Sequence, residues 1–246
     1  MKNVLSHRIV KIAHFVSLIP FAKTLLKPFY YPYKKRLNKR RNTEFVKNAI
    51  DVIKVFDDCL TDKGIDYCLL FGSMLGAVRE KGFIKHDLDI DTAIWYEDFS
   101  PNIKLTLEEA GFQLLHTFEI DNGKLAREDT FVYKNVSIDI FYIYPPIDKY
   151  PYCSSMWKPV EGCITLKDSM KKWGYIEGKR LELPLKKEFV RVPFESLLLP
   201  IPTNADEILS FYYGEDYMSS KPEWKEEKDF PYRKKWVNKK ATMISY

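Results

Sequence analysis

Two strand-like segments of this 246-residue chain carry aspartates among apolar side chains, and this limits how the chain can fold. In the segment DIDTAIW, Asp89 and Asp91 are two residues apart, so their side chains leave one face of a strand while Ile90 points into the core. Asp139 stands in a second apolar segment, VSIDIFYIY, where a carboxylate without a partner is costly. The two segments therefore predict neighbouring strands that bring three carboxylates together.

Carboxylates at this spacing are suited to hard divalent cations. The Cα atoms of Asp89 and Asp91 are expected about 6.6 Å apart, which lets both side chains share a pair of ions. We expect Asp89, Asp91 and Asp139 to hold Mg²⁺ or Mn²⁺ in a two-metal catalytic site. Asp87 continues the alternation in the loop ahead of the strand and is expected to help bind the substrate. A lone pair of aspartates is usually solvated, but the apolar flanks and the third acid argue against that interpretation here.

A phosphate-binding turn is predicted upstream, between an apolar run at 65–71 and a short helix. Gly72 lets a phosphate approach the backbone, and Ser73 and the helix N-terminus supply hydrogen-bond donors. Arg79 and Lys81 follow one to two turns later and add positive charge near a diphosphate. These four residues are predicted to bind the nucleotide or substrate.

The order of elements predicts an α+β fold, a mixed sheet with helices packed on it. A helix with apolar residues at helical spacing begins at Asn42 or Thr43 and ends at Gly64. The segment 65–71 is predicted to be a buried strand, and a turn is expected at 121–123. Further elements are a helix at 101–110 and strands at 89–95, 112–120, 131–134 and 136–144.

The net charge of +5 conceals a strongly basic N-terminal arm. Residues 1–50 hold twelve Lys or Arg and one acid, Glu44, whereas the rest carries 27 basic and 33 acidic side chains. We therefore divide the chain into an arm, 1–42, and a catalytic domain, 43–246. The mildly acidic domain argues against a nucleic-acid partner.

The arm combines an interrupted apolar stretch at 9–26 with a basic, aromatic cluster at 29–41. It is too broken to span a bilayer and has no signal-peptide cleavage site, but it is typical of an amphipathic helix lying on an anionic membrane surface. A helix packed on the body, with a solvated basic turn, is the alternative.

Four cysteines occur at no metal-type spacing. Cys59 and Cys68 are expected to be small core residues, and a disulfide or zinc site at Cys153 and Cys163 stays a minor alternative. A reducing, cytoplasmic compartment is the simplest interpretation.

The segment GSMLGAVREKGFIKHDLDID resembles the signature of the LicD family, which includes the fukutin-related proteins of the nucleotidyltransferase superfamily. IDIF at 138–141 is similar to the second acidic strand of that family, and 192–218 to its usual ending. Leu88 departs from the pattern, because many members carry another Asp there, and His86 replaces a frequent aromatic residue. The matching positions are Gly72, Ser73, Leu75, Gly76, Arg79, Gly82, Ile84, Asp87, Asp89 and Asp91.

The resemblance implies a nucleotidyltransferase-like fold that transfers a substituted phosphate, such as phosphocholine, from a CDP-activated alcohol to a glycan hydroxyl. A bacterial enzyme on the inner face of the membrane that modifies a surface polysaccharide, capsule or lipopolysaccharide precursor fits the free cysteines and the arm, and a lumenal type II membrane enzyme is the alternative. Asp139 would accept the proton of the acceptor hydroxyl. The alternatives are nucleotidyl transfer from an NTP to another acceptor and a non-catalytic glycan- or membrane-binding scaffold.

Overall fold

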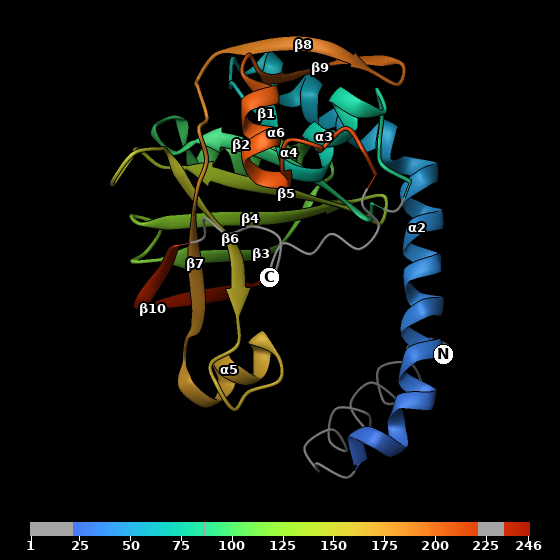
Figure 1. Cartoon of the computed structure of the whole chain (residues 1–246), viewed down its shortest axis with the longest axis vertical. Coiled ribbons are helices and arrows are strands. Elements are labelled where there is room, and N and C mark those ends of the chain that lie inside the picture. The colour runs from blue at the N-terminus through green and yellow to red at the C-terminus, as the bar shows by residue number, and fades with distance from the viewer. Residues whose placement is uncertain (1–21, 86, 221–233) are drawn as a thin grey trace.

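The strands of this chain form one large mixed sheet, which positions the aspartates described above. A computed structural model describes residues 22–85, 87–220 and 234–246. A second, two-stranded sheet consists of β8 (Phe189–Phe194) and β9 (Leu197–Pro202). The predicted α+β fold, a mixed sheet flanked by helices, is confirmed. In the order in which they pair, the strands of the large sheet are β1 (Cys68–Leu69), β2 (Asp89–Trp95), β5 (Val136–Ile143), β4 (Ala126–Tyr133), β3 (Gln113–Ile120), β10 (Lys234–Ser245), β7 (Ile176–Glu182) and β6 (Tyr152–Lys158) (Figure 1).

Helices pack beside the first strands of this sheet. α3 and α6 contact each other, and α3 contacts β2, whereas α2 packs on β5 and on α4. Figure 1 shows that the N-terminal half of α2 extends away from the sheet and that α5 lies at the far end of β6 and β7. The helices are α2 (Ala22–Asp62), α3 (Phe71–Arg79), α4 (Pro101–Glu109), α5 (Leu166–Trp173) and α6 (Ala205–Tyr213), with a 3₁₀ turn, η1 (Tyr96–Asp98).

The strands β2 and β5 are parallel neighbours, and the other pairs in the sheet are antiparallel. Short turns make the antiparallel connections. Lys134 and Asn135 both have positive φ, as a two-residue turn between twisted strands requires, and join β4 to β5. The predicted turn at 121–123 is also found, and all three of its residues have positive φ.

The first helix is longer than predicted. α2 runs without a break from Ala22 to Asp62, so the predicted start at Asn42 or Thr43 is wrong. Neither side chain caps the helix, because Thr43 donates to the Lys39 carbonyl one turn earlier and Asn42 donates to the Lys85 carbonyl in the loop before β2. Lys, Arg and Leu residues ahead of position 42 are good helix formers, and neither polar side chain is needed as a cap. The predicted end is confirmed by a positive φ at Gly64.

The strand predicted at 65–71 is reduced to the two residues of β1, although 67–71 are buried as expected. α3 already begins at Phe71, after Leu70 in extended conformation. Gly72 and Ser73 therefore lie in the first turn of the helix rather than in a turn ahead of it. The helices and strands predicted at 89–95, 101–110, 112–120 and 136–144 are present with small shifts, whereas β4 begins at Ala126, five residues before the prediction.

The second half of the chain, for which few elements were predicted, completes the sheet from its other edge. β6 and β7 form an antiparallel pair, and the C-terminal strand β10 inserts between β7 and β3. β6 also contacts β4 and β5, so the sheet curls over itself. The curl encloses a small second core that contains Phe118, Ile120 and Ile176.

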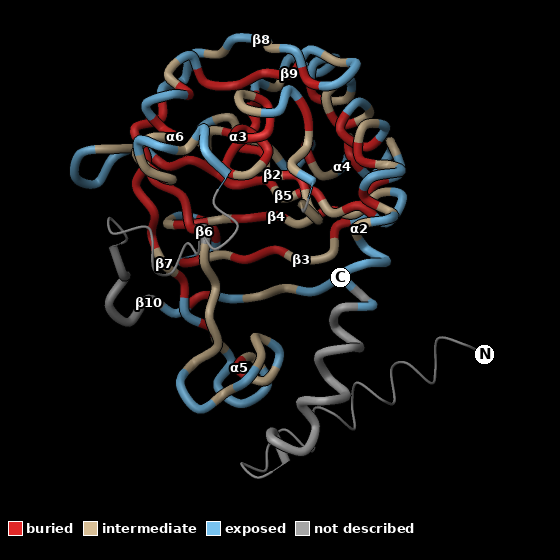
Figure 2. Tube along the Cα trace, turned by 45° about the vertical axis from the view of Figure 1, so that its right-hand side comes forward, coloured by how far each residue is buried: buried red, intermediate tan, exposed pale blue. Residues whose placement is uncertain are grey.

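The main core includes the face of β2 and β5 that is opposite the aspartates. Ile90, Ile94, Ile138 and Ile140 are fully buried together with the apolar face of α2. Figure 2 shows buried residues concentrated in the strands beneath the helices and exposed residues along β8. All four cysteines are free thiols. Cys68 and Cys153 are fully buried, so packing in the core accounts for these two.

In the part of the chain that the structure describes, no helix is both long and apolar enough to cross a bilayer. Most of the apolar stretch predicted at 9–26 lies outside the described residues. The prediction of membrane attachment is therefore untested.

Gly76 is where the packing of α3 leaves least room. A Cβ atom there would lie far inside van der Waals distance of the Gly82 carbonyl oxygen, a backbone atom that cannot move aside. We expect Gly76→Ala to lower the free energy of unfolding by about 1–3 kcal/mol, measured by urea denaturation. Gly72→Ala in the same helix is the control, because its Cβ would meet nothing closer than Asp91 Oδ2 at 3.4 Å. Equal stabilities of the two variants would contradict this account.

Candidate active site

Parallel pairing brings the three predicted metal ligands to one face of the sheet. Asp91 of β2 is the register partner of Asp139 of β5, and Asp89 is the partner of Ser137. Side chains at paired positions of neighbouring strands share a face, and Asp89 shares that face by alternation. The two strands thus present three carboxylates side by side, as the sequence predicted.

Asp87 joins the cluster from the loop ahead of β2. Its backbone N–H donates to the Ile84 carbonyl at 2.9 Å, which closes a turn. A Cβ atom built on Gly72 would lie 3.7 Å from both Asp87 carboxylate oxygens and 3.4 Å from Asp91 Oδ2. Gly72 therefore lies beside two of the carboxylates, and a methyl group at this position would be in van der Waals contact with both.

Two hydrogen bonds hold the start of α3 against β2. The Gly72 N–H donates to Asp91 Oδ2 at 3.2 Å, and the Asp91 N–H donates to Ser73 Oγ at 2.9 Å. Ser73 is 1% exposed. In this structure its hydroxyl fixes the helix to the strand, and its donation to a phosphate stays a prediction.

Two carboxylate oxygens in this cluster have no hydrogen-bond partner. Asp87 Oδ2 and Asp139 Oδ1 are both buried and unpartnered in the part of the chain that the structure describes. A buried carboxylate oxygen without a partner costs free energy that a bound cation would recover.

Asp129 shows how a structural buried aspartate differs. It lies on β4 next to Thr130, the register partner of Asp139, and is 3% exposed. Thr117 donates to it at 2.6 Å, Tyr142 at 3.1 Å and Arg127 through two nitrogens at 3.0 Å. Both oxygens of Asp129 are used within the fold, whereas one oxygen of Asp87 and one of Asp139 have no partner among the described residues.

The cluster is not a closed metal cage. Among residues 22–85, 87–220 and 234–246, no three His, Cys, Asp or Glu side chains are already arranged to hold an ion. Mg²⁺ is typically bound by one or two carboxylates together with waters and substrate phosphates, so a preformed cage is not required. An oxygen-only donor set with two unpartnered oxygens fits such an ion.

Burial and mutual repulsion raise the pKa values of these carboxyl groups. Burial, then the charge of Asp89, raises the pKa of Asp87 to about 6. Burial raises the pKa of Asp139 to about 7, although a hydrogen bond from Thr130 opposes the change. The pKa of Asp91 is raised well above its usual range by burial and by the charges of Asp89 and Asp139. The cluster therefore favours either protons or a cation.

Glu128 is a fourth acid of this face that the sequence analysis missed. It is 7% exposed, and the Trp157 indole Nε1 donates to its Oε2 at 2.7 Å. Burial and then the charge of Asp139 raise the pKa of Glu128. The strand was predicted to begin at 131, so Glu128 lay outside it. In a strand that begins earlier, Glu128 lies on the same face as Thr130, the register partner of Asp139.

The two predicted cations have different positions. Arg79 donates to Glu80 at 2.8 Å and to the Tyr217 carbonyl at 3.3 Å, and its charge lowers the pKa of Asp87. Lys81 is exposed, with its carbonyl accepting from the Glu195 N–H, and no contact described for it reaches the carboxylates. Its predicted role in binding stays a prediction.

Two further residues lie within electrostatic reach of the cluster. Arg41 of α2 opposes the burial effect, since its positive charge lowers the pKa of both Asp89 and Asp139. Burial raises the pKa of Tyr213 on α6, and the charges of Asp91 and Asp87 add to the effect. The sequence analysis assigned Arg41 to the membrane arm and gave Tyr213 no role.

His116 and Trp173 are of types that often act in acid–base chemistry or stack on ligands, but no contact described for them reaches the carboxylates. His116 is close to Ser245, and burial lowers its pKa. Trp173 is half exposed at the end of α5. His86 and Trp224 lie outside the described residues.

The raised pKa of Asp139 predicts how the stability of the protein depends on pH. A carboxyl group whose pKa is higher in the folded than in the unfolded state binds more protons when folded, so stability falls as pH rises between the two values. For Asp139 this window runs from its unperturbed 3.8 to about 7. In metal-free buffer we compare the Tm of Asp139→Asn with that of the wild type at each pH. We expect the Tm of the variant minus that of the wild type to increase by several degrees between about pH 4 and about pH 8.

Scanning calorimetry measures this difference, and Asp66→Asn at an exposed site is the control. A Tm difference that stays constant with pH would show that Asp139 is not under this electrostatic strain.

Comparison with known proteins assigns the chain to a family. Residues 64–204, more than half of the chain, match the family LicD/FKTN/FKRP, nucleotidyltransferase domain. The chain is 36% identical over 107 residues to the ribitol-5-phosphate transferase FKTN of Mus musculus, covering 42% of this chain and 22% of that protein. It is 27% identical over 144 residues to the Homo sapiens protein of the same name, covering 55% and 30%.

An uncharacterized protein of Rickettsia prowazekii, RP689, is 30% identical over 114 residues, which are 45% of this chain and 40% of that protein. The chain thus spans less than half the length of these relatives. The matched region contains all four clustered aspartates and the start of α3. The chain belongs to the LicD/FKTN/FKRP family of nucleotidyltransferase domains.

Proposed function

We propose that this protein transfers a substituted phosphate from a CDP-activated alcohol to a hydroxyl group of a glycan, with Mg²⁺ or Mn²⁺ bound at Asp89, Asp91 and Asp139. The observation that carries the proposal is the register pairing of Asp91 with Asp139, whose buried Oδ1 has no partner. The FKTN relatives are named ribitol-5-phosphate transferases, so ribitol phosphate joins phosphocholine as a candidate for the transferred group.

The reaction is an in-line displacement. The acceptor oxygen forms a bond to the phosphorus that carries the alcohol, the bond from that phosphorus to the CMP oxygen breaks, and CMP leaves. Asp139, whose buried Oδ1 is not used within the fold, takes the proton of the acceptor hydroxyl. Bound divalent ions supply Lewis acidity toward the hydroxyl and the diphosphate.

The other residues of the cluster orient the substrate and the ligands. The bonds from Gly72 and to Ser73 fix the orientation of Asp91. Gly72 brings the backbone of α3 close to Asp87 and Asp91, where a side chain would contact both carboxylates. Arg79 is already close to Asp87 and is a donor for the departing CMP.

Asp89→Ala tests the assignment. We expect its rate of CMP release from CDP-ribitol or CDP-choline to fall by about 100-fold or more, because the variant loses charge stabilisation of the transition state. Circular dichroism should show an unchanged fold, and calorimetry should show weaker Mn²⁺ binding. Asp66→Ala, at an exposed position outside the site, is the control. More than a few percent of wild-type activity in Asp89→Ala would exclude the metal assignment.

The same assay separates the alternatives. Release of pyrophosphate from an NTP, without CMP from a CDP-alcohol, would favour nucleotidyl transfer. A wild-type protein that binds neither Mn²⁺ nor a cytidine nucleotide would favour a non-catalytic scaffold.

For the arm at 1–42 we propose attachment to an anionic membrane surface, where the transferase would meet a lipid-linked glycan precursor. The support is the sequence, since a basic cluster follows an apolar stretch. A location on the inner membrane face of a bacterium would suit four free cysteines.

Vesicle sedimentation tests the arm. We expect the protein to bind vesicles containing about 30% anionic lipid, to bind purely zwitterionic vesicles much less, and to lose most binding when salt is raised to about 0.5 M, because screening weakens the attraction. Equal binding to both vesicle types would contradict an electrostatic anchor.

A further inference from the structure

Arg41 lies on the face of α2 that packs against the body. The buried residues Phe45, Ala49, Val52 and Phe56 recur at helical spacing and define that face. Arg41 is four residues before Phe45, so it extends the same face by one turn. Unlike these four buried residues, Arg41 is exposed. It therefore stands at the border where the helix leaves the sheet.

This turn of α2 is fixed to the entrance of the carboxylate strand. The Asn42 side chain donates to the Lys85 carbonyl at 3.1 Å, and the Phe45 ring packs edge-on against Phe83 with ring centroids 4.9 Å apart. Lys85 precedes Asp87 by two residues. The helix position that carries Arg41 is thus tied to the loop that leads into the site.

The charge of Arg41 reaches carboxylates on two strands. Its charge lowers the pKa of Asp89 on β2 and of Asp139 on β5, which agrees with a position within electrostatic reach of both strands. Arg79, by contrast, acts on Asp87, is only 11% exposed and is held by Glu80 and the Tyr217 carbonyl. Arg41 is the more open of these two cations and has a planar fork of donors that matches phosphate oxygens.

We propose that Arg41, from the helix ahead of the family-matched region 64–204, binds the phosphate groups of the donor when it occupies the carboxylate cluster. The inference rests on the proposed function for the identity of the donor. It gives residue 41 of the basic segment a role in the site itself, distinct from membrane attachment.

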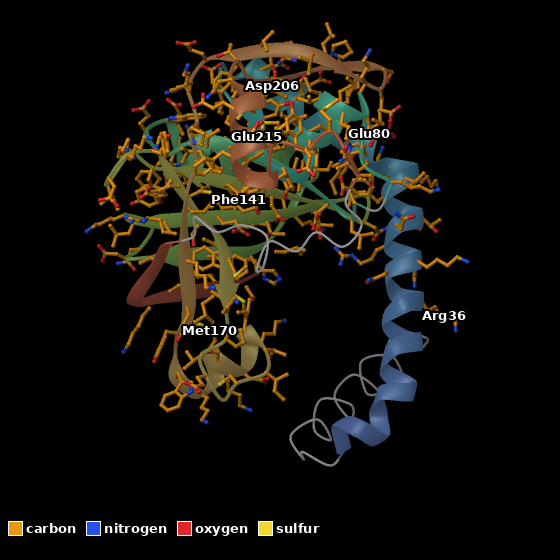
Figure 3. The ribbon with its side chains drawn as sticks, viewed as in Figure 1. Arg36, Glu80, Phe141, Met170, Asp206 and Glu215 are labelled. Atoms are coloured by element: carbon orange, nitrogen blue, oxygen red, sulfur yellow. The ribbon has the colours of Figure 1, made fainter. Side chains whose placement is uncertain are left out.

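Arg41→Gln is the test, with Arg36→Gln as the matched control. Figure 3 shows Arg36 on the side of the same helix that is turned away from the sheet. With Mn²⁺ present, we expect Arg41→Gln to weaken calorimetric binding of CDP and of inorganic pyrophosphate about 10-fold or more, as for loss of one charge-assisted bidentate contact. Arg36→Gln should match the wild type, and Arg41→Lys should recover part of the loss.

A purely structural counter-ion would behave differently. In that case Arg41→Gln would change Tm or Mn²⁺ affinity while the affinity for CDP and pyrophosphate stayed the same, and the inference would be overturned. Equal losses in Arg41→Gln and Arg36→Gln would also overturn it, because they would indicate a general effect of positive charge. Failure of the wild type to release CMP from CDP-alcohols would remove the proposed function alone, since the pyrophosphate comparison would still decide the role of Arg41.

Discussion

The parallel pairing of β2 with β5 is the constraint on which the site depends. Parallel neighbours need a long connection, and here α4, β3 and β4 provide it before the chain returns. The pairing sets Asp91 beside Asp139, and a slip of one residue would turn Asp139 into the apolar core. The buried isoleucines on the opposite face, Ile90 and Ile138, oppose such a slip because each would have to leave the core. Packing on one face therefore fixes the spacing of charges on the other.

Repulsion among the carboxylates is a cost that the rest of the fold has to offset. Asp91 and Asp139 are held together although their charges raise each other's free energy, and hydrogen bonds from the Gly72 N–H to Asp91 and from Thr130 to Asp139 oppose this effect. Asp129, on the same sheet, shows that the fold can fully partner a buried aspartate where its role is structural. The difference between Asp129 and Asp139 lies in the unused oxygen, and an unused buried oxygen is what a cation-binding site requires before its ion arrives.

Much of this site could be predicted from the sequence because its signals are local. Alternation in DIDTAIW gave the bounds of β2 and the shared face of Asp89 and Asp91, and an acid in an apolar strand indicated Asp139. Glu128 could not be found in this way, because its strand begins earlier than propensity suggests and its partner, Trp157, is 29 residues away. The insertion of β10 between β3 and β7 is equally non-local, since no pattern in a strand names its neighbours.

The unbroken helix α2 connects the basic arm to the body of the protein. A cap at Asn42 would have allowed the basic segment to move independently, but the helix continues through it, and Asn42 instead donates to the Lys85 carbonyl. A continuous helix transmits orientation, because each turn is fixed by hydrogen bonds to the previous one. The basic residues of α2 are therefore linked through one rigid helix to the loop that carries Asp87. A contact made by these residues would act on that loop. A surface that orients α2 would therefore also orient the carboxylate face of the sheet.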